Sequence, residues 1–374
     1  MTGRHDLFMA IADLQHGGAQ RVFSQLANQW TAEGLRISVA TLSRPEDDFF
    51  ELDARVHRQC IGGIARSPGL LQALGGNAGR LRGLRRAMRA ADAPCILSFV
   101  GAMNIMCVIA AAGLGRRVVI SERNDPSRQS LGRAWDRLRR WCYPRADLVT
   151  ANSQSALRAL AGFVPQHKLA YVPNPFAAPA GNEVADLPAH TILNVGRLTG
   201  QKAQDVLIQA FAKARTICAA TDWHLALIGT GEAEASLRQL TDELGLGARV
   251  HFLGRTRDPY PYYRAASVFA LPSRFEGTPN ALLEAMSCGL PAIVSDGSGG
   301  PLDYVTDGET GLVARTGDID ALSAALVRVM ADDDLRTHLG AAARERMHRE
   351  SFDAAIQIWR KTLDLPAATT VNNR

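Results

Sequence analysis

The sequence has few lysines and no long apolar run. Only four of its 42 basic residues are lysines, namely Lys168, Lys202, Lys213 and Lys361. No apolar stretch approaches the roughly 18 to 20 residues that a membrane-spanning helix needs. Residues 1–14 are soon interrupted by Asp13, so they predict a first strand rather than a signal peptide. We therefore expect no transmembrane helix and a cytoplasmic protein.

The six cysteines are scattered and show no paired spacing of the kind that indicates a metal site. We expect reduced core residues. Asp318 and Asp320 have the spacing of a metal-binding motif, but they precede an alanine-rich stretch and fit charges at a helix N-terminus. We therefore assign no metal and no cofactor. The cysteines are Cys60, Cys95, Cys107, Cys142, Cys218 and Cys288.

Strand-like and helix-like runs alternate along the chain, which predicts parallel sheets covered by helices on both faces. The chain has 374 residues, 47% of them apolar, enough for two domains with their own cores. A proline-rich break without periodicity follows residue 172. We therefore predict an α/β protein with two Rossmann-like, doubly wound domains that face a central cleft. The expected parts are a first domain 1–175, a linker 176–190, a second domain 191–350, a final helix 351–365 that crosses back to the first domain, and a tail 366–374.

The positive charge is concentrated in the first half. Residues 1–175 carry 23 basic and 13 acidic side chains, whereas residues 176–374 carry 19 and 24. Two expected helices carry much of this charge, and their basic faces suit an anionic membrane surface or an acceptor phosphate. A solvated helix face is the alternative, and without a recognisable nucleic-acid module we expect no nucleic-acid partner. The first helix carries Arg82, Arg85, Arg86 and Arg89; the second combines Arg133, Arg137 and Arg140 with Trp135, Leu138 and Trp141.

The segment 275–291 holds two glutamates in different settings. Thr278 and Pro279 predict a helix start, with a capping hydroxyl followed by proline at the first helical position. Glu276 then lies in the preceding loop, and Glu284 lies on the second helical turn. The positive helix end between them offers N–H groups to an anion. This order fits a nucleotide-sugar, and it also fits a capping glutamate followed by a surface glutamate.

Other loops also follow expected strands. Arg197 and Lys202 come after a strand that ends at Gly196, and two cations there suit a diphosphate or remain solvated. The scarcity of lysine favours the first alternative. Two glycine pairs follow further strands, where they let backbone approach a ligand or form tight turns. These pairs are Gly229 with Gly231, and Gly17 with Gly18.

Together these stretches resemble family 4 of the retaining glycosyltransferases, which have the GT-B fold. The resemblance covers nearly the whole chain and includes "GGAQRV", "ANS", "VPNP", "NVGRLTGQKAQDVLIQAF", "LIGTGEAEASLRQL" and "DGETGLV". Its most specific mark is the pair Glu276 and Glu284, separated by seven residues. The stretch "SERNDP" resembles the subgroup that extends lipid-linked oligosaccharides or exopolysaccharides.

The resemblance implies a role for each candidate. Glu276 would hold hydroxyls of the donor sugar, and Glu284 would hold the ribose hydroxyls. Arg197 and Lys202 would bind the diphosphate and stabilise its growing charge without a metal. The other donor-binding residues implied are Gly17, Gly18, Gly196, Gly229, Gly231, Arg255, Gly277, Thr278 and Asn280.

One position departs from the family pattern. Many members have a histidine just after a strand of the first domain, near the sugar. Here the matching stretch "VVISERNDP" offers Arg123 instead. Arg123 would contact the donor or an acceptor phosphate, and an ordinary charged loop is the alternative.

The sequence therefore predicts a retaining, metal-independent glycosyltransferase that moves a hexose or N-acetylhexosamine from a nucleotide-diphosphate sugar, UDP-linked, to a glycan acceptor. We expect the acceptor to be lipid-linked and met at the inner face of the cell membrane by a peripheral protein. Two alternatives are a GT-B-fold nucleotide-sugar epimerase and a membrane- or nucleic-acid-binding protein with a vestigial nucleotide site. The intact set of Glu276, Glu284, Arg197 and Lys202 argues against decay.

Overall fold

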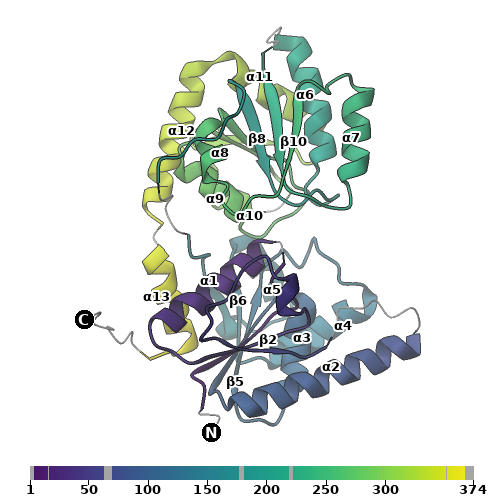
Figure 1. Ribbon diagram of the computed structural model, residues 1–374, viewed down its shortest axis with the longest axis vertical. Helices are drawn as coiled ribbons and strands as arrows, with labels where there is room; N and C mark the ends of the chain where they lie inside the picture. Colours follow the sequence, from purple (N-terminus) through teal and green to yellow (C-terminus); the bar gives the residue numbers. More distant parts are fainter. Residues whose placement is uncertain are drawn as a thin grey trace. The chain divides into compact units, whose positions relative to one another are not determined.

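The chain forms two compact units (Figure 1). Unit 1 comprises Met1–Pro175 and Asp353–Arg374, and unit 2 comprises Phe176–Phe352. The computed structural model describes residues 4–15, 17–62, 70–176, 181–218, 222–297, 299–350 and 352–366, with only the backbone of 70–76. The described part of the stretch 176–190 therefore belongs to unit 2, where Phe176 is buried in the core.

Unit 1 is built on a seven-stranded parallel sheet in the order β3-β2-β1-β4-β5-β6-β7. The strand order reverses between β1 and β4, and doubly wound folds bind ligands beyond the carboxyl ends of strands at such a point. The strands are β1 (Leu7–Ala10), β2 (Ile37–Thr41), β3 (His57–Cys60), β4 (Cys95–Phe99), β5 (Arg117–Glu122), β6 (Leu148–Ala151) and β7 (Leu169–Tyr171). The helices are α1 (Gly18–Ala32), α2 (Leu70–Ala91), α3 (Gly101–Ala111), α4 (Arg133–Cys142), α5 (Gln154–Ala161) and α13 (Phe352–Leu363), with 3₁₀ turns at Pro45–Asp47, Tyr143–Arg145 and Gln166–Lys168.

The central strands of unit 1 are buried throughout because helices cover both faces of the sheet. On one face, α3 packs against both α2 and α4. On the other face, Phe23 of α1 and Trp359 of α13 both contact Phe99 at the end of β4. The edge strand β3 is polar, which suits a strand whose outer side is unpaired.

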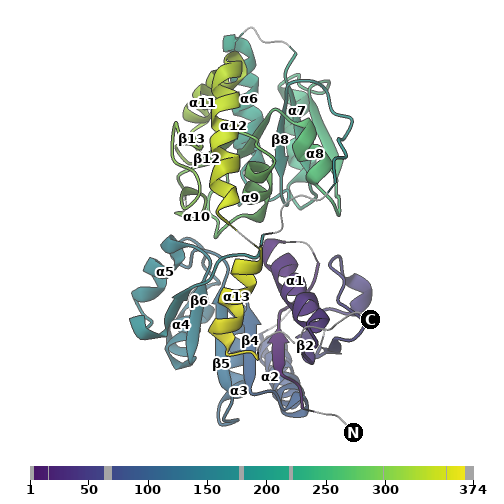
Figure 2. The same ribbon diagram turned by 90° about the vertical axis from the view of Figure 1, so that its left-hand side faces the viewer.

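Helix α13 packs on unit 1 although it follows unit 2 in the chain (Figure 2). Trp359 is fully buried, and its ring stacks on Phe99 with 5.6 Å between the ring centroids. Its indole N–H donates to the Pro173 carbonyl at 3.1 Å. Arg117 of β5 donates to Asp364 at 2.6 Å, just beyond the helix. Unit 1 is thus completed by the far end of the sequence.

Unit 2 has a six-stranded parallel sheet in the order β10-β9-β8-β11-β12-β13, which repeats the winding of unit 1. The prediction of two doubly wound parallel sheets is therefore confirmed. The strands are β8 (Thr191–Val195), β9 (His224–Ile228), β10 (Val250–Gly254), β11 (Val268–Leu271), β12 (Ala292–Ser295) and β13 (Gly311–Ala314). The helices are α6 (Gln204–Cys218), α7 (Glu234–Glu243), α8 (Tyr260–Ala265), α9 (Asn280–Ser287), α10 (Gly299–Leu302), α11 (Ile319–Ala331) and α12 (Asp333–His348).

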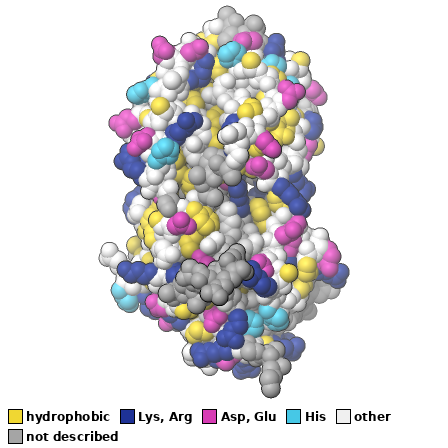
Figure 3. Space-filling model, turned by 60° about the vertical axis from the view of Figure 1, so that its left-hand side comes forward, with side chains coloured by type: hydrophobic (Ala, Val, Ile, Leu, Met, Phe, Trp, Pro, Cys, Tyr) yellow, Lys and Arg dark blue, Asp and Glu magenta, His cyan; other side chains and the backbone are white. Residues whose placement is uncertain are grey.

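Within the described ranges, no helix is both long enough and apolar enough to cross a membrane. On the face drawn in Figure 3, basic and acidic side chains are interspersed, and the apolar side chains form separate patches.

Candidate functional site

Loops that follow β8, β9 and β10 are joined at the carboxyl ends of the unit 2 strands. The Leu198 N–H donates to the Thr230 carbonyl at 3.1 Å, and the Gly229 N–H donates to the Gly254 carbonyl at 2.6 Å. These bonds fix three segments that are far apart in sequence into one layer. The layer lies where an open α/β sheet binds its ligands.

Gly229 and Gly231 are required by the packing of this layer. A Cβ atom on Gly229 would lie 1.9 Å from the Gly196 carbonyl oxygen, and one on Gly231 would lie 2.1 Å from the Leu198 carbonyl oxygen. Gly229 also has a φ of +141°, which L side chains rarely adopt. The sequence suggested ligand approach or a tight turn. In the structure these glycines let a neighbouring loop approach, a role that their spacing did not reveal.

Lys202 and Glu276 form an ion pair across two of the loops. The Lys202 Nζ lies 2.5 Å from Glu276 Oε1, and the side chains are 14% and 8% exposed. Gln201 fixes the same junction, because its side chain donates to the Phe275 carbonyl at 2.9 Å. The structure thus unites two residues that the sequence singled out separately. An ammonium and a carboxylate at one edge can bind a phosphate and a hydroxyl.

The side chain of Arg197 is exposed, but its backbone carbonyl is fixed by a buried hydrogen-bond network. The Gln204 side chain donates to the Arg197 carbonyl at 3.0 Å and to Asn194 Oδ1 at 3.2 Å. Asn194 in turn donates to the Ala270 carbonyl of β11 at 2.7 Å. Gln204 and Asn194 are each 1% exposed and were missed from the sequence. A polar residue inside an apolar strand or on the buried side of a helix is the signal that marks them.

Helix α9 begins one residue later than predicted. Pro279 occupies the N-cap position and the cap has no side-chain hydrogen bond, so the prediction of Thr278 as the capping residue is wrong. Asn280 is the first helical residue, which still places Glu284 on the second turn. Glu284 is 4% exposed and accepts a hydrogen bond from the hydroxyl of Tyr263, on α8, at 3.1 Å. The alternative of a surface glutamate is therefore wrong.

Two further predicted residues border the same loops. Gly277 is backed by Gly300, since a Cβ on Gly300 would lie 1.8 Å from the Gly277 carbonyl oxygen. Arg255 is exposed, and its Nε donates to Thr230 Oγ1 at 2.8 Å. The site in unit 2 therefore combines exposed arginines with a half-buried lysine and two buried glutamates.

In unit 1, Gly17 is the N-cap of α1 and Gly18 is its first residue. Gly17 has a φ of +151°, and a Cβ there would lie 2.4 Å from Gln20 Oε1. The Gln20 side chain donates to Asp13 at 3.1 Å, which braces the loop from β1. The glycine pair thus begins α1, after the loop that follows β1, without a capping side chain.

Arg123 is buried, with 6% of its surface exposed, so the alternative of an ordinary charged loop is wrong. Its guanidinium lies 5.1 Å from the centroid of the Phe99 ring, and Nη2 donates to Asn174. Its Nε and Nη1 have no hydrogen-bond partner within the described residues. Burial, the largest cause, lowers the pKa of Arg123 to about 9.

Three sequence motifs meet at this arginine. Asn152 of "ANS" donates to Asn174 Oδ1 of "VPNP" at 3.2 Å, and Asn174 also accepts from Arg123 of "SERNDP". Glu122 beside Arg123 is buried too, which raises its pKa, and the Tyr143 hydroxyl donates to it at 2.7 Å. The motifs therefore form an interior polar network at the carboxyl ends of β5 and β6.

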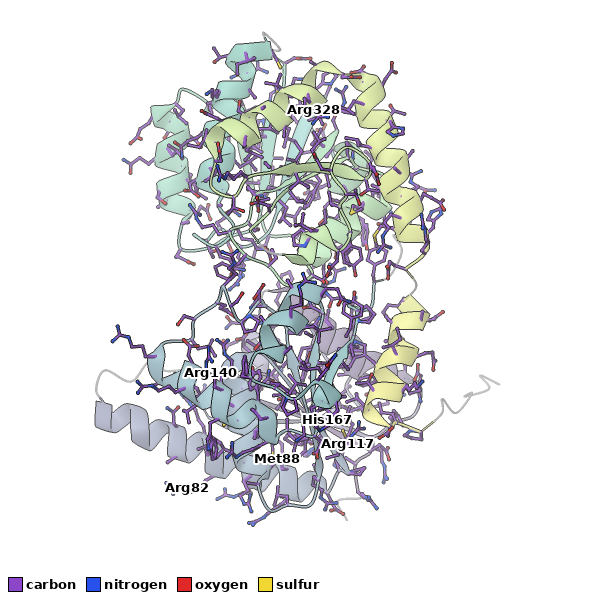
Figure 4. All side chains as sticks on the ribbon, turned by 180° about the vertical axis from the view of Figure 1, so that it is seen from behind. Arg82, Met88, Arg117, Arg140, His167 and Arg328 are labelled. Carbon is purple, nitrogen blue, oxygen red and sulfur yellow. The ribbon has the colours of Figure 1, made fainter. Side chains whose placement is uncertain are left out.

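The four arginines of α2 differ in surroundings. Arg85 donates to the carbonyls of Ala110 and Ala112 at 2.6 and 2.7 Å, at the C-terminal end of α3. It therefore satisfies helix-end carbonyls instead of extending an open basic face. Arg82, Arg86 and Arg89 remain exposed (Figure 4 labels Arg82).

Asp318 and Asp320 have the structural roles predicted for them. Asp318 caps α11, accepting from the backbone N–H of Asp320 at 3.0 Å, and Asp320 pairs with Lys213 at 2.6 Å. The described residues contain no group of three or more His, Cys, Asp or Glu side chains that could hold a metal. The six cysteines are free, but Cys60 is exposed, so the prediction of a core position is wrong for it.

Two family models match successive parts of the chain. The model described as Glycosyltransferase Family 4 matches residues 16–177, and the model described as Glycosyl transferases group 1 matches residues 182–346. The first match contains Arg123 and the α2 arginines. The second contains Arg197, Lys202 and both glutamates.

Named relatives and a solved structure agree with these matches. The chain is 26% identical, over 94% of its length and 96% of the relative, to a Campylobacter jejuni alpha-1,4-N-acetyl-D-galactosaminyltransferase named for a diNAcBac-PP-undecaprenol-linked acceptor. It is 31% identical over 74% of its length to an exopolysaccharide phosphotransferase of Streptomyces coelicolor, of which it spans only 29%. The structure of Anabaena Alr3699/HepE with UDP and glucose has the same fold, with a TM-score of 0.79 at 19% identity over 96% of this chain and all of the other.

Proposed function

The chain belongs to the family 4 glycosyltransferases of the GT-B fold, and we propose that it is a retaining enzyme that transfers a hexose or N-acetylhexosamine from a nucleotide-diphosphate sugar to a glycan acceptor. We propose UDP as the nucleotide, supported by the UDP named in the HepE structure. A lipid-linked acceptor in surface glycan synthesis is supported by the undecaprenol named for the Campylobacter relative. Such an acceptor would be met by a peripheral protein at the inner face of the cell membrane.

The Lys202–Glu276 ion pair is the observation that carries the donor assignment. In the proposed complex, Lys202 and Arg197 contact the diphosphate, and Glu276 accepts hydrogen bonds from sugar hydroxyls. Glu284, oriented by Tyr263, holds the ribose hydroxyls. Gly277 and the N-terminus of α9, with Thr278 and Asn280, lie between the two glutamates in sequence and offer N–H groups to phosphate oxygens.

The proposed chemistry needs no protein nucleophile. The bond between the sugar C1 and the diphosphate oxygen breaks, and the acceptor oxygen bonds to C1 on the same face. The proton of the acceptor hydroxyl passes to the departing phosphate oxygen. Positive charge from Lys202 and Arg197 stabilises that phosphate as its charge grows, which is why we propose a metal-independent reaction. In unit 1, Gly17 and Gly18 would offer backbone N–H groups to the donor. Arg123 would contact the donor or an acceptor phosphate while its Nη2 is held by Asn174.

The test is nucleotide release from a panel of UDP-, GDP- and dTDP-sugars, with and without an undecaprenyl-diphosphate-linked oligosaccharide. We expect acceptor-dependent release with one UDP-sugar, and NMR of the product should show that the anomeric configuration of the donor is kept. Lys202→Gln should abolish release, whereas Lys213→Gln, at the exposed lysine of the same unit, should not. An inverted product would contradict the retaining mechanism, and absence of release with every donor and acceptor would contradict the proposal as a whole.

A further inference from the structure

Helix α4 exposes two large apolar side chains on the surface of unit 1. Trp141 is 53% exposed and Leu138, one turn earlier, is 38% exposed. Trp141 is the only exposed Phe, Trp or Tyr in the part of the chain that the structure describes. The packing of α4 is provided by buried Cys142 and half-buried Trp135, which lie beside Leu138 on the helix surface. The apolar stripe of α4 therefore continues from the core of unit 1 onto the exposed surface of the helix.

Four exposed arginines lie on α4 and on the 3₁₀ turn that follows it. Arg145 packs its guanidinium 3.8 Å from the centroid of the Trp141 ring, and Arg140 lies over Phe163 at 5.6 Å. Arg133 and Arg137 are exposed on the same helix (Figure 4 labels Arg140). We call Leu138 and Trp141 with these four arginines the α4 face.

The acidic residue of α4 does not neutralise the α4 face. Asp136 is engaged locally, accepting from Ser130 Oγ at 2.6 Å, from the Leu131 N–H at 3.0 Å and from Arg139 at 3.0 Å. Arg139 is buried and also donates to the Pro126 carbonyl at 3.1 Å. Arg139 therefore forms the ion pair with Asp136, and within the described residues the four outward arginines form no ion pair.

We propose that the α4 face is a docking surface for an anionic lipid bilayer. Trp141 and Leu138 would enter the interfacial layer while the arginines contact lipid phosphates, a combination typical of interfacial helices. A second copy of this chain fits poorly, because two arginine-rich faces would repel each other. A nucleic acid would leave the aliphatic Leu138 without a partner. Helix α2, which packs on α3 as α4 does, adds the exposed Arg82, Arg86 and Arg89 to the charge of this helix layer.

Docking of the α4 face on a membrane does not depend on the transfer reaction. The experiment is flotation of the full chain with vesicles of phosphatidylcholine alone or with about one third phosphatidylglycerol. We expect binding only to the anionic vesicles, and weaker binding as salt rises. Trp141→Ser with Leu138→Ser should reduce the bound fraction by about tenfold, and Arg137→Gln with Arg140→Gln should do the same at low salt.

Ile217→Ser is the matched control, because Ile217 on α6 of unit 2 is 58% exposed and the lysine one turn earlier, Lys213, is paired with Asp320. It should bind vesicles like the wild type. Brominated lipids should quench the fluorescence of Trp141. The difference in quenching between the wild type and the Trp141→Phe variant gives the contribution of this residue. Equal binding to neutral vesicles, wild-type binding by the double variant, or quenching unchanged in Trp141→Phe would each overturn the proposal. Preferential binding of an oligonucleotide to the same face would overturn it too. Nucleotide release by the variants reports separately on the proposed transferase activity.

Discussion

The two units share a winding order, but they place their ionic groups differently. In unit 2, Lys202 and Glu276 lie in loops beyond the strand ends, where the lysine keeps 14% of its surface exposed. In unit 1, Glu122 and Arg123 lie at the end of β5 and are both interior. The same position beyond a strand therefore gives a partly exposed ion pair between loops in one unit and an interior network in the other. The covering elements, more than the strand order, decide which role a charged residue takes.

The cost of burial also differs between the units. A buried arginine without full hydrogen bonding is unfavourable, and the lowered pKa of Arg123, about 9, reflects that cost. The Phe99 ring and the Asn174 side chain offset part of it. The Trp359 ring of α13 stacks on Phe99, so the polar network around Arg123 depends on this helix from the end of the sequence.

The largest expected effect lies in the ion pair of unit 2. Glu276→Gln keeps the shape of the side chain but removes the charge, so it should lower kcat by about 100- to 1,000-fold. The affinity for UDP should stay within about threefold, because the sugar contact rather than the nucleotide contact is lost. Steady-state kinetics and calorimetric titration with UDP measure the two quantities.

Glu284→Gln is the matched variant for this prediction. It should weaken UDP binding by about tenfold and leave kcat closer to that of the wild type, because a ribose contact contributes to binding before reaction. If both glutamine variants changed the same parameter, the division of roles between the two glutamates would be wrong.

The next largest effect should be on the stability of unit 1. Trp359→Ala removes a fully buried ring and should lower the free energy of unfolding by about 3 to 5 kcal/mol. Urea denaturation measures the change. Trp141→Ala, at the exposed tryptophan of the same unit, should change stability by less than about 0.5 kcal/mol. A similar loss in both variants would contradict the packing described for α13.

A pair of tyrosine variants sharpens the comparison most directly. Tyr143→Phe and Tyr263→Phe each remove a hydroxyl that donates to a buried glutamate, Glu122 in unit 1 and Glu284 in unit 2. We expect Tyr143→Phe to cost about 1 to 3 kcal/mol of stability with UDP affinity unchanged. Tyr263→Phe should weaken UDP binding as well. The difference between the units would be lost if Tyr143→Phe reduced UDP affinity and Tyr263→Phe did not.

The smallest effect concerns pH and a histidine relay in unit 2. Arg249 Nη1 lies 2.9 Å from His224 Nε2, and His224 Nδ1 lies 2.9 Å from His251 Nε2. Arginine only donates, so His224 must be neutral to accept at Nε2 and donate at Nδ1. Burial first, and then the positive charge of Arg249, lowers the pKa of His224 from 6.5.

The sign of the pH effect follows from this direction. Below about pH 6.5 the unfolded chain binds a proton at His224 that the folded chain resists, so the relay contributes stability above that pH and loses it as the pH falls through the folded pKa. Because His224 is only half-buried, water screens the interaction and the change should stay below about 1 kcal/mol. Urea unfolding at pH 7.5 and 5.5 measures it. His224→Gln should reduce the slope, and a wild type that gained stability at pH 5.5 would contradict the relay.

The sequence revealed the alternation of strands and helices because buried parallel strands are continuous apolar runs. It also located the loops with Lys202 and Glu276, since charged residues after such runs fall at one edge of a sheet. The boundary of α9 was missed by one residue because Pro279 fits both the cap and the first helical turn.

The contacts between distant loops could not be predicted in the same way. The Gly229 and Gly231 spacing is compatible with a tight turn, and only the approach of the loop from Gly196 shows why a side chain is excluded. The arginine pattern of α2 likewise predicted one continuous basic face. It could not show that Arg85 reaches the end of α3, because that distance depends on how two helices pack.

The position of Trp359 affects how the protein can be made. The ribosome releases the residues of α13 only after all of unit 2 has emerged, which at synthesis rates of about 5 to 20 residues per second leaves a delay of roughly ten to forty seconds. During that time the nascent first unit lacks the ring that covers Phe99. A chaperone that shields this aromatic surface would matter most in that interval. A chain terminated before α13 would keep Phe99 uncovered by Trp359 permanently.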